Sequence, residues 1–392
     1  MKKICVLALL LQGTLYAQNA IPYTPVNANR IPIGAFPFLN LSYDARSAAI
    51  GEAGVATTPD QHSAYLNPAK LVFLPKKDSI NHDVSALSLA FTKYAKPLIP
   101  GMILGGFSAF RTNEKNQAFA LNVKYFHAGM TELRDFQGKF VKNIRSQEFA
   151  IEGFHARPIN EKNSFALGLR LTHSNLAQNG TINVPSKPIN AISGDIFYFH
   201  QGRENREKQW LNYGASLTNI GAKVAYLDYK ERSFQPTRLK VGIAQNFILG
   251  STQKEKETRL MLTVDANKLL VPTQPLRAID NSILAGKDEA TISGIGSIFQ
   301  SWTTAPDGIK ETFQEIYYNV GAELDIKEFI ALRAGYFAQN KNKGNLHYLT
   351  AGAGLHLGDF SLDAALLFPD KASKLLAQTF RLQLTYFPTK NN

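Results

Sequence analysis

Histidine is the residue type in this sequence best suited to catalysis or metal binding, but its distribution supports neither. The eight histidines are dispersed, no two stand at the spacing of paired metal ligands, and neither an H-E-x-x-H nor a G-x-S-x-G motif occurs. Residues 293–297 lack the lysine and the strand–turn–helix setting of a phosphate-binding loop. We therefore predict a protein that is not an enzyme, with no catalytic residues, no metal site and no cofactor.

Basic side chains form a second group that could act, here by electrostatic attraction. Each of four basic residues alternates with apolar residues along its own segment, so each would lie on the strand face opposite to the apolar side chains. If that face lined a pore, the cations could guide anions through it. Alternatively, they pair with acidic groups such as Glu152 or Asp265, or they anchor a segment that fills the pore. The four residues are Lys124, Arg170, Arg333 and Arg381.

The composition favours a folded, aromatic-rich protein over a disordered or coiled-coil chain. Of 392 residues, 19% are charged, below the roughly 25% of typical soluble domains, while Phe and Tyr number 25 and 15. The formal charge of +12 is compatible with nucleic acid, a membrane surface or lipopolysaccharide phosphates as partners. Of these we predict outer-membrane lipid or lipopolysaccharide, and no nucleic acid.

Residues 1–17 have the three parts of a secretory signal peptide. Lys2 and Lys3 form the charged region, residues 4–11 the apolar region, and residues 15–17 a small-residue cleavage site. We expect cleavage after Ala17 and export to the cell outer membrane. The single cysteine, Cys5, would be removed with the signal peptide, which leaves neither a disulfide nor a thiolate metal site in the mature chain.

Apolar residues alternate with small or polar residues along many later segments, as membrane-spanning strands require. Residues 119–125 and 165–171 are clear examples, with an aliphatic or aromatic side chain at every odd position. No segment offers the roughly 18 uninterrupted apolar residues of a transmembrane helix. A closed barrel can nevertheless cross a membrane, because each backbone polar group pairs with a neighbouring strand.

The number of alternating segments predicts the size of this barrel. From residue 84 onward we count about 14 strands, an even number, as bacterial barrels have. A soluble β-sandwich or propeller would show the same period, but the signal peptide, the aromatic residues at strand ends and the final strand near the C-terminus favour a membrane protein. The predicted strand centres are Leu89, Gly105, Val123, Ile151, Leu169, Phe197, Ala215, Val241, Leu262, Val320, Leu332, Ala353, Ala364 and Leu384. The strand-end aromatic residues are Tyr125, Phe126, Tyr336, Phe337, Tyr386 and Phe387.

Two regions do not alternate. We predict that residues 18–83, rich in Pro, Ala and Gly, form a hatch of turns and short helices that plugs a barrel formed by residues 84–392. A periplasmic linker is the alternative. The second region is a long loop at 268–313, whose length is typical of a functional or disordered segment. Its apolar centre suggests a surface that folds over the barrel mouth or meets a partner.

The motifs of the chain, taken in order, resemble the PorV (LptO) outer-membrane proteins of the type IX secretion system, which belong to the FadL-like barrels. In the predicted hatch the resemblance rests on residues 44–47, 51–57 and 67–70, of which 67–69 resemble an element common to FadL-like barrels. The chain departs from the family pattern at residues 92–94 and at Asp307. The later matching segments are 217–221, Asp265, 267–268, 272–273, 301–302, 305–306, 315–316, 331–337 and 350–355.

The resemblance implies an all-β fold, a 14-stranded transmembrane β-barrel of the FadL-like type with an N-terminal hatch plugging the lumen. It also implies a shuttle that binds cargo proteins with C-terminal signal domains as they leave the type IX translocon barrel (SprA/Sov-like) and delivers them to the cell-surface sortase (PorU-like) attachment complex. The residues of the hatch motif would be Asp44, Arg46, Asn67, Pro68 and Ala69. The predicted partner or cargo contacts in the long loop are Ile295, Ile298, Phe299, Trp302, Ala305 and Pro306.

A FadL-like transporter of long-chain fatty acids or other hydrophobic small molecules is the competing hypothesis. It would need an apolar pocket beside the hatch and an opening in the barrel wall. A general porin, the third hypothesis, would need an ion path past the hatch. The inward residues that the alternation assigns are largely small, polar or basic, which favours the shuttle over the hydrophobic transporter.

Overall fold

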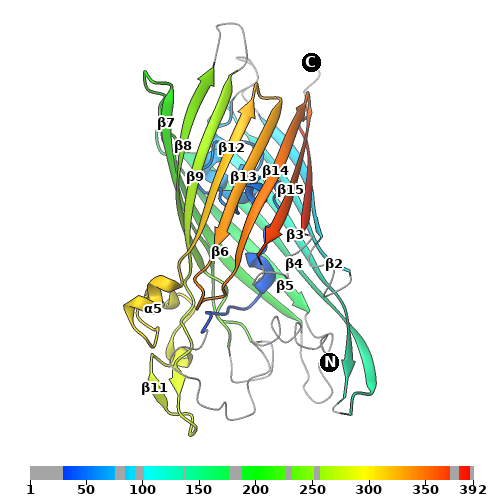
Figure 1. Ribbon diagram of the computed structural model, residues 1–392, viewed down its shortest axis with the longest axis vertical. Coiled ribbons are helices and arrows are strands. Elements are labelled where there is room, and N and C mark those ends of the chain that lie inside the picture. The colour runs from blue at the N-terminus through cyan, green and yellow to red at the C-terminus, as the bar shows by residue number, and fades with distance from the viewer. Residues whose placement is uncertain are drawn as a thin grey trace.

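The computed structural model describes residues 30–75, 84–93, 101–135, 137–175, 188–225, 232–250, 257–370 and 379–388. Within them, 14 strands form a closed antiparallel barrel, in which β1 pairs with β16 to close the wall (Figure 1). The predicted signal peptide and the limits of the predicted hatch, at residues 18 and 83, lie outside the described residues.

Every predicted strand centre falls inside a barrel strand, so the predicted all-β barrel is confirmed. The barrel strands are β1 (Ser85–Lys93), β2 (Met102–Thr112), β3 (Ala118–Arg134), β4 (Phe140–Pro158), β5 (Asn163–Asn175), β6 (Ile189–His200), β7 (Gln209–Ile220), β8 (Arg238–Gly250), β9 (Thr258–Leu269), β12 (Tyr317–Ile326), β13 (Ile330–Ala338), β14 (His347–Leu357), β15 (Phe360–Pro369) and β16 (Phe380–Tyr386).

The two faces of the wall differ as the alternation predicts. In β1, Leu89 points outward and is 63% exposed, whereas Thr92 points inward and is fully buried. The outer face repeats this pattern with bulky apolar side chains such as Leu169 of β5. Such a face is favourable against lipid and unfavourable against water. None of the helices in the described part of the chain is long and apolar enough to cross a membrane.

Aromatic residues at the strand ends divide between the two faces. Tyr125 and Tyr336 point outward, but Phe126 and Phe337, their neighbours along the strand, are buried inside the barrel. The reason is the period of a strand, which sends consecutive side chains to opposite faces. Only one member of each pair can therefore mark the membrane interface, and Phe126 instead stacks on Phe38 with ring centroids 6.4 Å apart.

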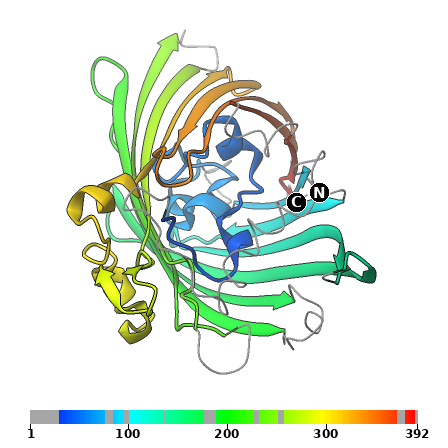
Figure 2. The ribbon, with the colours of Figure 1, turned by 60° about the horizontal axis from the view of Figure 1, so that its bottom comes forward.

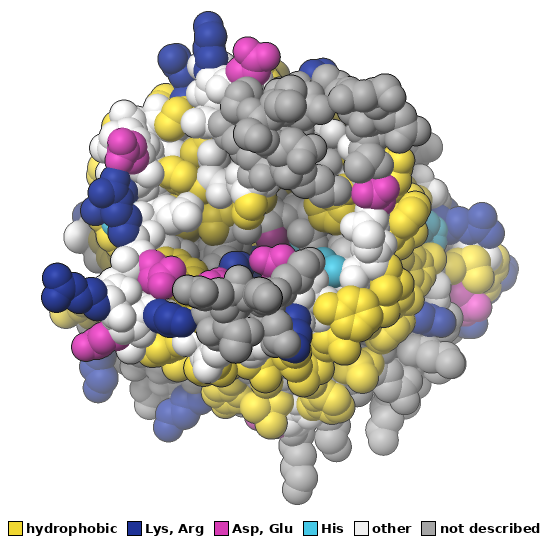
Figure 3. Space-filling view, turned by 90° about the horizontal axis from the view of Figure 1, so that it is seen from above, with side chains coloured by type: hydrophobic (Ala, Val, Ile, Leu, Met, Phe, Trp, Pro, Cys, Tyr) yellow, Lys and Arg dark blue, Asp and Glu magenta, His cyan; other side chains and the backbone are white. Residues whose placement is uncertain are grey.

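The two ends of the barrel have connections of very different length. At one end, uppermost in Figure 1, neighbouring strands are joined by short connections such as 327–329 and 358–359. At the other end the connections include 221–237 and 270–316. We call these the short-connection end and the long-connection end. Seen from the short-connection end, the molecule is hollowed at its centre, with acidic and basic side chains at the edge of the hollow (Figure 3).

The predicted long loop is folded rather than structureless. It runs from the end of β9 to the start of β12 and carries several short elements. These are β10 (Leu276–Arg277), β11 (Ile283–Ala285), η3 (Glu289–Thr291), α4 (Ser297–Gln300) and α5 (Ile309–Gln314).

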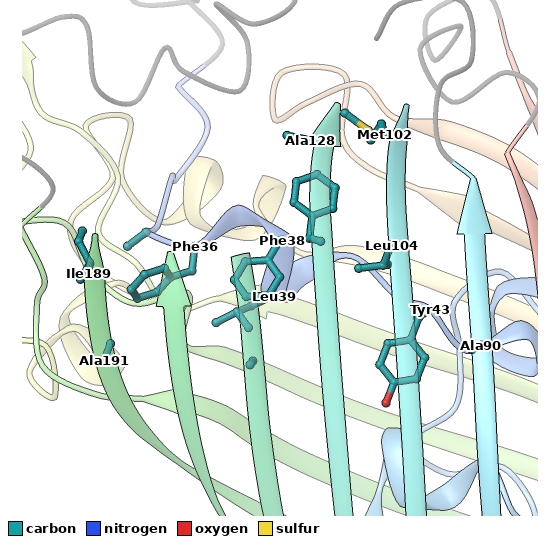
Figure 4. Close-up of a cluster of buried hydrophobic side chains, with 13 residues drawn as sticks. Phe36, Phe38, Leu39, Tyr43, Ala90, Met102, Leu104, Ala128, Ile189 and Ala191 are labelled. Carbon is teal, nitrogen blue, oxygen red and sulfur yellow. The ribbon is translucent and has the colours of Figure 1, made fainter. Parts of the chain in front are cut away.

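The described part of the predicted hatch, residues 30–75, lies inside the barrel (Figure 2). Its short helices are η1 (Pro37–Asn40), α2 (Ala45–Ala49), α3 (Ser63–Leu66) and η2 (Pro68–Phe73). Apolar contacts hold its first part, where Phe36, Phe38 and Leu39 pack against residues of β1, β2, β3 and β6 (Figure 4). Below we call residues 30–75 the hatch. We place the candidate site where its polar residues meet the wall.

Candidate functional site

A network of buried charges joins the hatch to three strands on one side of the wall. Four members come from the hatch and three from β12, β13 and β15. We call this the luminal charge network. Its members are Asp44, Arg46, Asp60 and His62 of the hatch and Glu323, Arg333 and Asp363 of the wall.

His62 bridges the hatch and the wall. Its Nδ1 lies 2.6 Å from Oδ2 of Asp44, and its Nε2 lies 3.2 Å from Oδ2 of Asp363. Because both ring nitrogens face carboxylates, the doubly protonated imidazolium fits the site. Asp44 also begins helix α2, where its Oδ1 accepts a 2.7 Å hydrogen bond from the backbone N–H of Ser47. One carboxylate thus orders a helix of the hatch and holds the bridging histidine.

Arg46, the second residue of helix α2, makes the second bridge. Its Nε and Nη2 donate to the two carboxylate oxygens of Glu323 at 2.7 and 2.5 Å, a bidentate pairing that fixes orientation as well as distance. Its Nη1 lies 2.8 Å from Asp60 of the hatch. Arg333 then donates to Glu323 and to Asp363, at 2.6 Å each. The network is therefore continuous from β12 through β13 to β15.

The His62 bridge makes the stability of the hatch depend on pH. Burial alone would lower the pKa of His62, but the carboxylates of Asp44, Asp60 and Asp363 raise it from 6.5 to about 10. A pKa raised by folding stabilises fully below the unfolded value and loses its effect as the pH rises through the folded value. We expect the urea midpoint difference between wild type and His62→Gln, in detergent, to be large at pH 6 and to shrink toward pH 10.

Lys70 changes the stability with pH in the opposite direction to His62, and the comparison of wild type with His62→Gln cancels this contribution. Burial lowers the pKa of Lys70 to about 7, so this residue favours folding more as the pH rises between about 7 and 10.5. Lys70 is present in both proteins, and the difference between them isolates His62. A midpoint difference that does not change with pH would contradict a charged His62.

The hatch approaches the wall most closely over glycines of the wall strands. Residues 49–55 cross the inner face of five strands at points where the wall has no side chain, and a Cβ at Gly321 would lie 2.5 Å from the carbonyl oxygen of Ile50. A Cβ at Gly242 would similarly lie 2.7 Å from Cγ1 of Val55. We call these glycines the glycine track. Its members are Gly214, Gly242, Gly321, Gly335 and Gly352.

Gly51 of the hatch also requires the absence of a side chain. Its φ of 71° lies in the left-handed region, and a Cβ there would lie 2.7 Å from the backbone nitrogen of Tyr336. Its N–H donates to Oγ1 of Thr350 at 2.9 Å, and its carbonyl oxygen accepts from Asn319. Asp265 of β9 completes the contact by accepting from the N–H groups of Gly54 and Val55 at 2.8 and 3.1 Å.

The Asn67-Pro68-Ala69 element fixes the far part of the hatch. Oδ1 of Asn67 accepts from the N–H of Ala69 at 3.2 Å, which begins helix η2, and Pro68 suits the first helical position. Nδ2 of Asn67 donates to the carbonyl oxygens of Val55 and of Tyr198 in β6, at 2.9 and 3.1 Å. The five predicted hatch residues thus all have structural contacts, at two separate places.

The four predicted inward cations all face the lumen, and each holds an internal partner. Arg170 lies 2.8 Å from Glu152, which was a predicted partner, and 2.9 Å from Asp195. Lys124 donates to carbonyl oxygens of the hatch, at Leu39 and Leu41. Arg333 belongs to the luminal charge network, and Arg381 lies 2.5 Å from Glu52 of the hatch. Of the two interpretations, pairing and anchoring therefore describes these four residues.

A second cluster joins the start of the hatch to the long loop. Arg30 lies 3.0 Å from both Asp307 and Glu311, so the departure from the family pattern at position 307 supplies an ion-pair partner. Lys343, in the β13–β14 connection, lies 2.6 Å from Glu311 and 3.2 Å from Glu315. Glu315 also pairs with Lys268 at the end of β9. Helix α5 is thereby held against the hatch.

The predicted contact residues of the long loop divide by exposure. Ile295 and Phe299 are 62% and 74% exposed, whereas Ala305 is buried and Ile298, Trp302 and Pro306 are half-buried. Trp302 packs under Lys268, whose Nζ lies 5.2 Å from the indole ring. The structure adds two exposed apolar residues on α5, Ile309 and Phe313, which the sequence analysis missed. Their spacing of four on one short helix was the available signal.

The arrangement is suited to holding the hatch in place rather than to chemistry. The described residues contain no group of three or more His, Cys, Asp or Glu side chains that could hold a metal ion. The charges of the network are buried and engaged with one another, so they offer no vacant nucleophile or base. What the geometry provides is a barrel lumen that holds the hatch and, at the long-connection end, a folded loop fastened to the hatch.

Comparisons with known proteins agree with this architecture. A family model described as "Type IX secretion system protein PorV" matches residues 24–276. Among solved structures, a deltaS2 mutant of the TodX monoaromatic hydrocarbon channel has a TM-score of 0.50 at 12% identity, covering 89% of this chain and 99% of that one. The Pseudomonas putida toluene transporter TodX has a TM-score of 0.49 at 11% identity, with 92% and 99% covered. A Pseudomonas aeruginosa FadL homologue has a TM-score of 0.43 at 12% identity, with 88% and 98% covered. Only the first of these three structures reaches a TM-score of 0.50, and at 12% identity its likeness concerns the fold alone. A comparison with curated proteins gives no match.

Proposed function

Because the chain belongs to the PorV family of type IX secretion system proteins, we propose that it acts in the outer membrane as a shuttle for secreted proteins. It would bind cargo with C-terminal signal domains as the cargo leaves the translocon barrel, and deliver it to the sortase attachment complex at the cell surface. The observation that carries the proposal is a barrel whose lumen holds the hatch, fastened by ion pairs to a folded loop with exposed apolar residues at one end.

The lengths of the connections support one orientation in the membrane. Outer-membrane barrels have short turns on the periplasmic side and longer loops on the outside. The short-connection end, with 327–329 and 358–359, would thus face the periplasm, and the loop 270–316 would face the cell exterior. In this orientation the exposed loop residues lie on the side where cargo is released and attached.

The hatch supports a binding role over that of an open pore. It is held by the luminal charge network, by the glycine track and by Asp265, contacts that extend from β7 to β15. Moving it would separate several buried ion pairs at once, at a cost of several kcal/mol each. A protein that works at its outer surface has no need to move its plug.

The exposed loop residues are the proposed contact surface. Ile295, Phe299, Ile309 and Phe313 are each at least 60% exposed. Large apolar side chains are the residues that provide most of the energy at protein interfaces when they become buried by a partner. The half-buried Trp302 and the buried Ala305 would support the loop from below. Lys268 and Glu315 fix the base of that support.

We expect the double variant Ile295→Asp/Phe299→Asp to lose at least 90% of its co-purifying translocon and cargo, because charged side chains at an interface centre are strongly unfavourable (roughly 2 kcal/mol or more each, over tenfold in affinity). The measurement is quantitative mass spectrometry of tagged protein purified from gently solubilised outer membranes. Ile159→Asp provides the matched control, since Ile159 is 58% exposed in the short β4–β5 connection at the opposite end.

The same purification from wild type tests the proposed function itself. Recovery of a very large barrel, a sortase-like protease and several secreted proteins that share a C-terminal domain would support the shuttle. Recovery of the barrel alone with retained fatty acid or hydrocarbon would instead favour the hydrophobic transporter. Co-purification that is unchanged in the double variant would remove the loop from the interface without removing the shuttle.

A further inference from the structure

A cavity of about 400 Å³ lies between the hatch and the wall. Its lining includes Ile31 and Pro32 at the start of the hatch and Gln314 and Asn340 from connections at the long-connection end. This volume lies within the range of ordinary small-molecule sites. The charged side chains that line the cavity are Lys124, Arg170, Arg238, Lys240, Lys343, Arg381, Glu52, Glu152 and Glu315.

Most of the cations lining this cavity have a carboxylate partner. Arg170 pairs with Glu152 and Asp195, and Lys240 lies 3.7 Å from Asp265. Arg381 and Lys343 pair with Glu52 and Glu315, as described above. These pairs neutralise one another and leave no excess charge for a ligand.

Arg238, the first residue of β8, differs from them. Among the described residues its guanidinium makes one hydrogen bond, from Nη1 to the hydroxyl of Tyr317 at 3.3 Å, and no ion pair. A guanidinium has five N–H donors and remains charged at any physiological pH. Lys124 also lacks a carboxylate within ion-pair distance in the described part of the chain, but two carbonyl oxygens of the hatch hold its ammonium group. Arg238 is thus a permanent positive charge that lines the cavity, and most of its N–H donors have no partner among the described residues.

We propose that this cavity is an anion-binding site, in which Arg238 and the hydroxyl of Tyr317 hold a carboxylate or phosphate group. The planar guanidinium matches the spacing of two oxygens of either group, which a single ammonium does not. Lys240, on the same face of β8 two residues further along, also lines the cavity, but its charge is matched by Asp265, so Arg238 supplies the unmatched charge. The apolar side chains of Leu346, Tyr348 and Leu367 line another part of the cavity and leave room for a short organic substituent on the anion. This inference is independent of the secretion role.

Calorimetric titration of the full-length barrel, purified in a non-ionic detergent at constant ionic strength, tests the site. Inorganic phosphate and acetate serve as the two oxyanions, and butyl phosphate tests the apolar part of the lining. We expect saturable binding of at least one of them, weakened about tenfold or more in Arg238→Gln, since a charge-assisted hydrogen bond is worth this much. Arg238→Lys should bind with intermediate affinity. Lys341→Gln, which removes an exposed charge in the β13–β14 connection, should bind like wild type.

The outcomes separate the sources of the anion. Equal affinities for phosphate and butyl phosphate would support a free inorganic anion, and tighter binding of butyl phosphate would support the head group of a larger ligand. No saturable binding of any of the three anions, or affinities within twofold for wild type and Arg238→Gln, would overturn the proposal. Heat-dependent mobility on gels shows whether Arg238→Gln assembles. If it does not, the anion affinities of wild type and Arg238→Lys are compared instead, and affinities within twofold would again overturn the proposal.

Discussion

Replacing Gly335 by leucine is expected to lift the hatch off the wall of the barrel. A Cβ at this position would overlap the backbone of Ile50 and Gly51, and neither backbone segment can rotate away as a flexible side chain would. Two hydrogen bonds also hold Gly51: its N–H donates to Thr350, and its carbonyl oxygen accepts from Asn319. Overpacking of a tight interior costs about 1–3 kcal/mol when side chains can adjust, and a backbone overlap belongs at or above the upper limit.

Two measurements report on the displacement in Gly335→Leu. Hydrogen exchange of residues 45–55 should speed up at least tenfold, and single-channel conductance in a planar bilayer should exceed that of wild type. Gly153→Leu is the matched control, because Gly153 lies on the outer face of β4 and a Cβ there meets nothing within 4 Å. Wild-type exchange and conductance in Gly335→Leu would mean that the hatch does not rest on the glycine track as described.

Replacing Glu323 by glutamine should destabilise the hatch more than any other single isosteric change in the luminal charge network. Glu323 accepts from both Arg46 and Arg333, so its neutralisation leaves two buried guanidinium groups close together without a shared counter-charge. Breaking a buried ion pair by removing one partner costs about 3–5 kcal/mol. We therefore expect the hatch to become sensitive to protease at a lower urea concentration than in wild type. Limited proteolysis in detergent measures this midpoint.

The control for Glu323→Gln is the same substitution at an exposed ion pair. Glu132 lies 2.7 Å from Arg134 on the projecting β3–β4 hairpin, with both side chains about half exposed. Exposed pairs contribute less than about 1 kcal/mol, so Glu132→Gln should leave the midpoint nearly unchanged. Equal effects of the two substitutions would show that the network does not hold the hatch.

The barrel could be predicted because its signal is local. Each strand carries its own alternation, so Leu89 or Leu384 can be assigned from its immediate neighbours, and short connections then force neighbouring strands to pair. The same alternation places Tyr125 and Phe126 on opposite faces of the strand, although both are aromatic residues near a strand end. The folded elements of the long loop escaped because helices of four to six residues give too few positions for a helical period.

The site could be predicted only in part because its contacts are distant in sequence. The family motif identifies Asp44 and Arg46, and the alternation identifies Arg333, yet nothing local in the sequence shows that Glu323 connects Arg46 to Arg333. His62 looked like one of several dispersed histidines, since its partner Asp363 is 301 residues away. The wall glycines under the hatch were equally hidden, because a glycine in a strand records the close approach of another segment without saying which.

The separation in sequence between the hatch and its partners has a consequence for how the protein forms. The hatch precedes every strand, but Arg46 and Glu323 are 277 residues apart, and Ala45 donates its N–H to Gln383 of β16, 338 residues away. Contacts between residues so far apart in the sequence cannot form early, because the long chain segment between them must first lose its conformational freedom. Arg46 and His62 of the hatch therefore gain their wall partners, Glu323 and Asp363, only when the last strands are in the wall. A chain that stops before β12 would keep the hatch charges but lack their partners in the wall, so the ordering of the plug depends on a complete barrel.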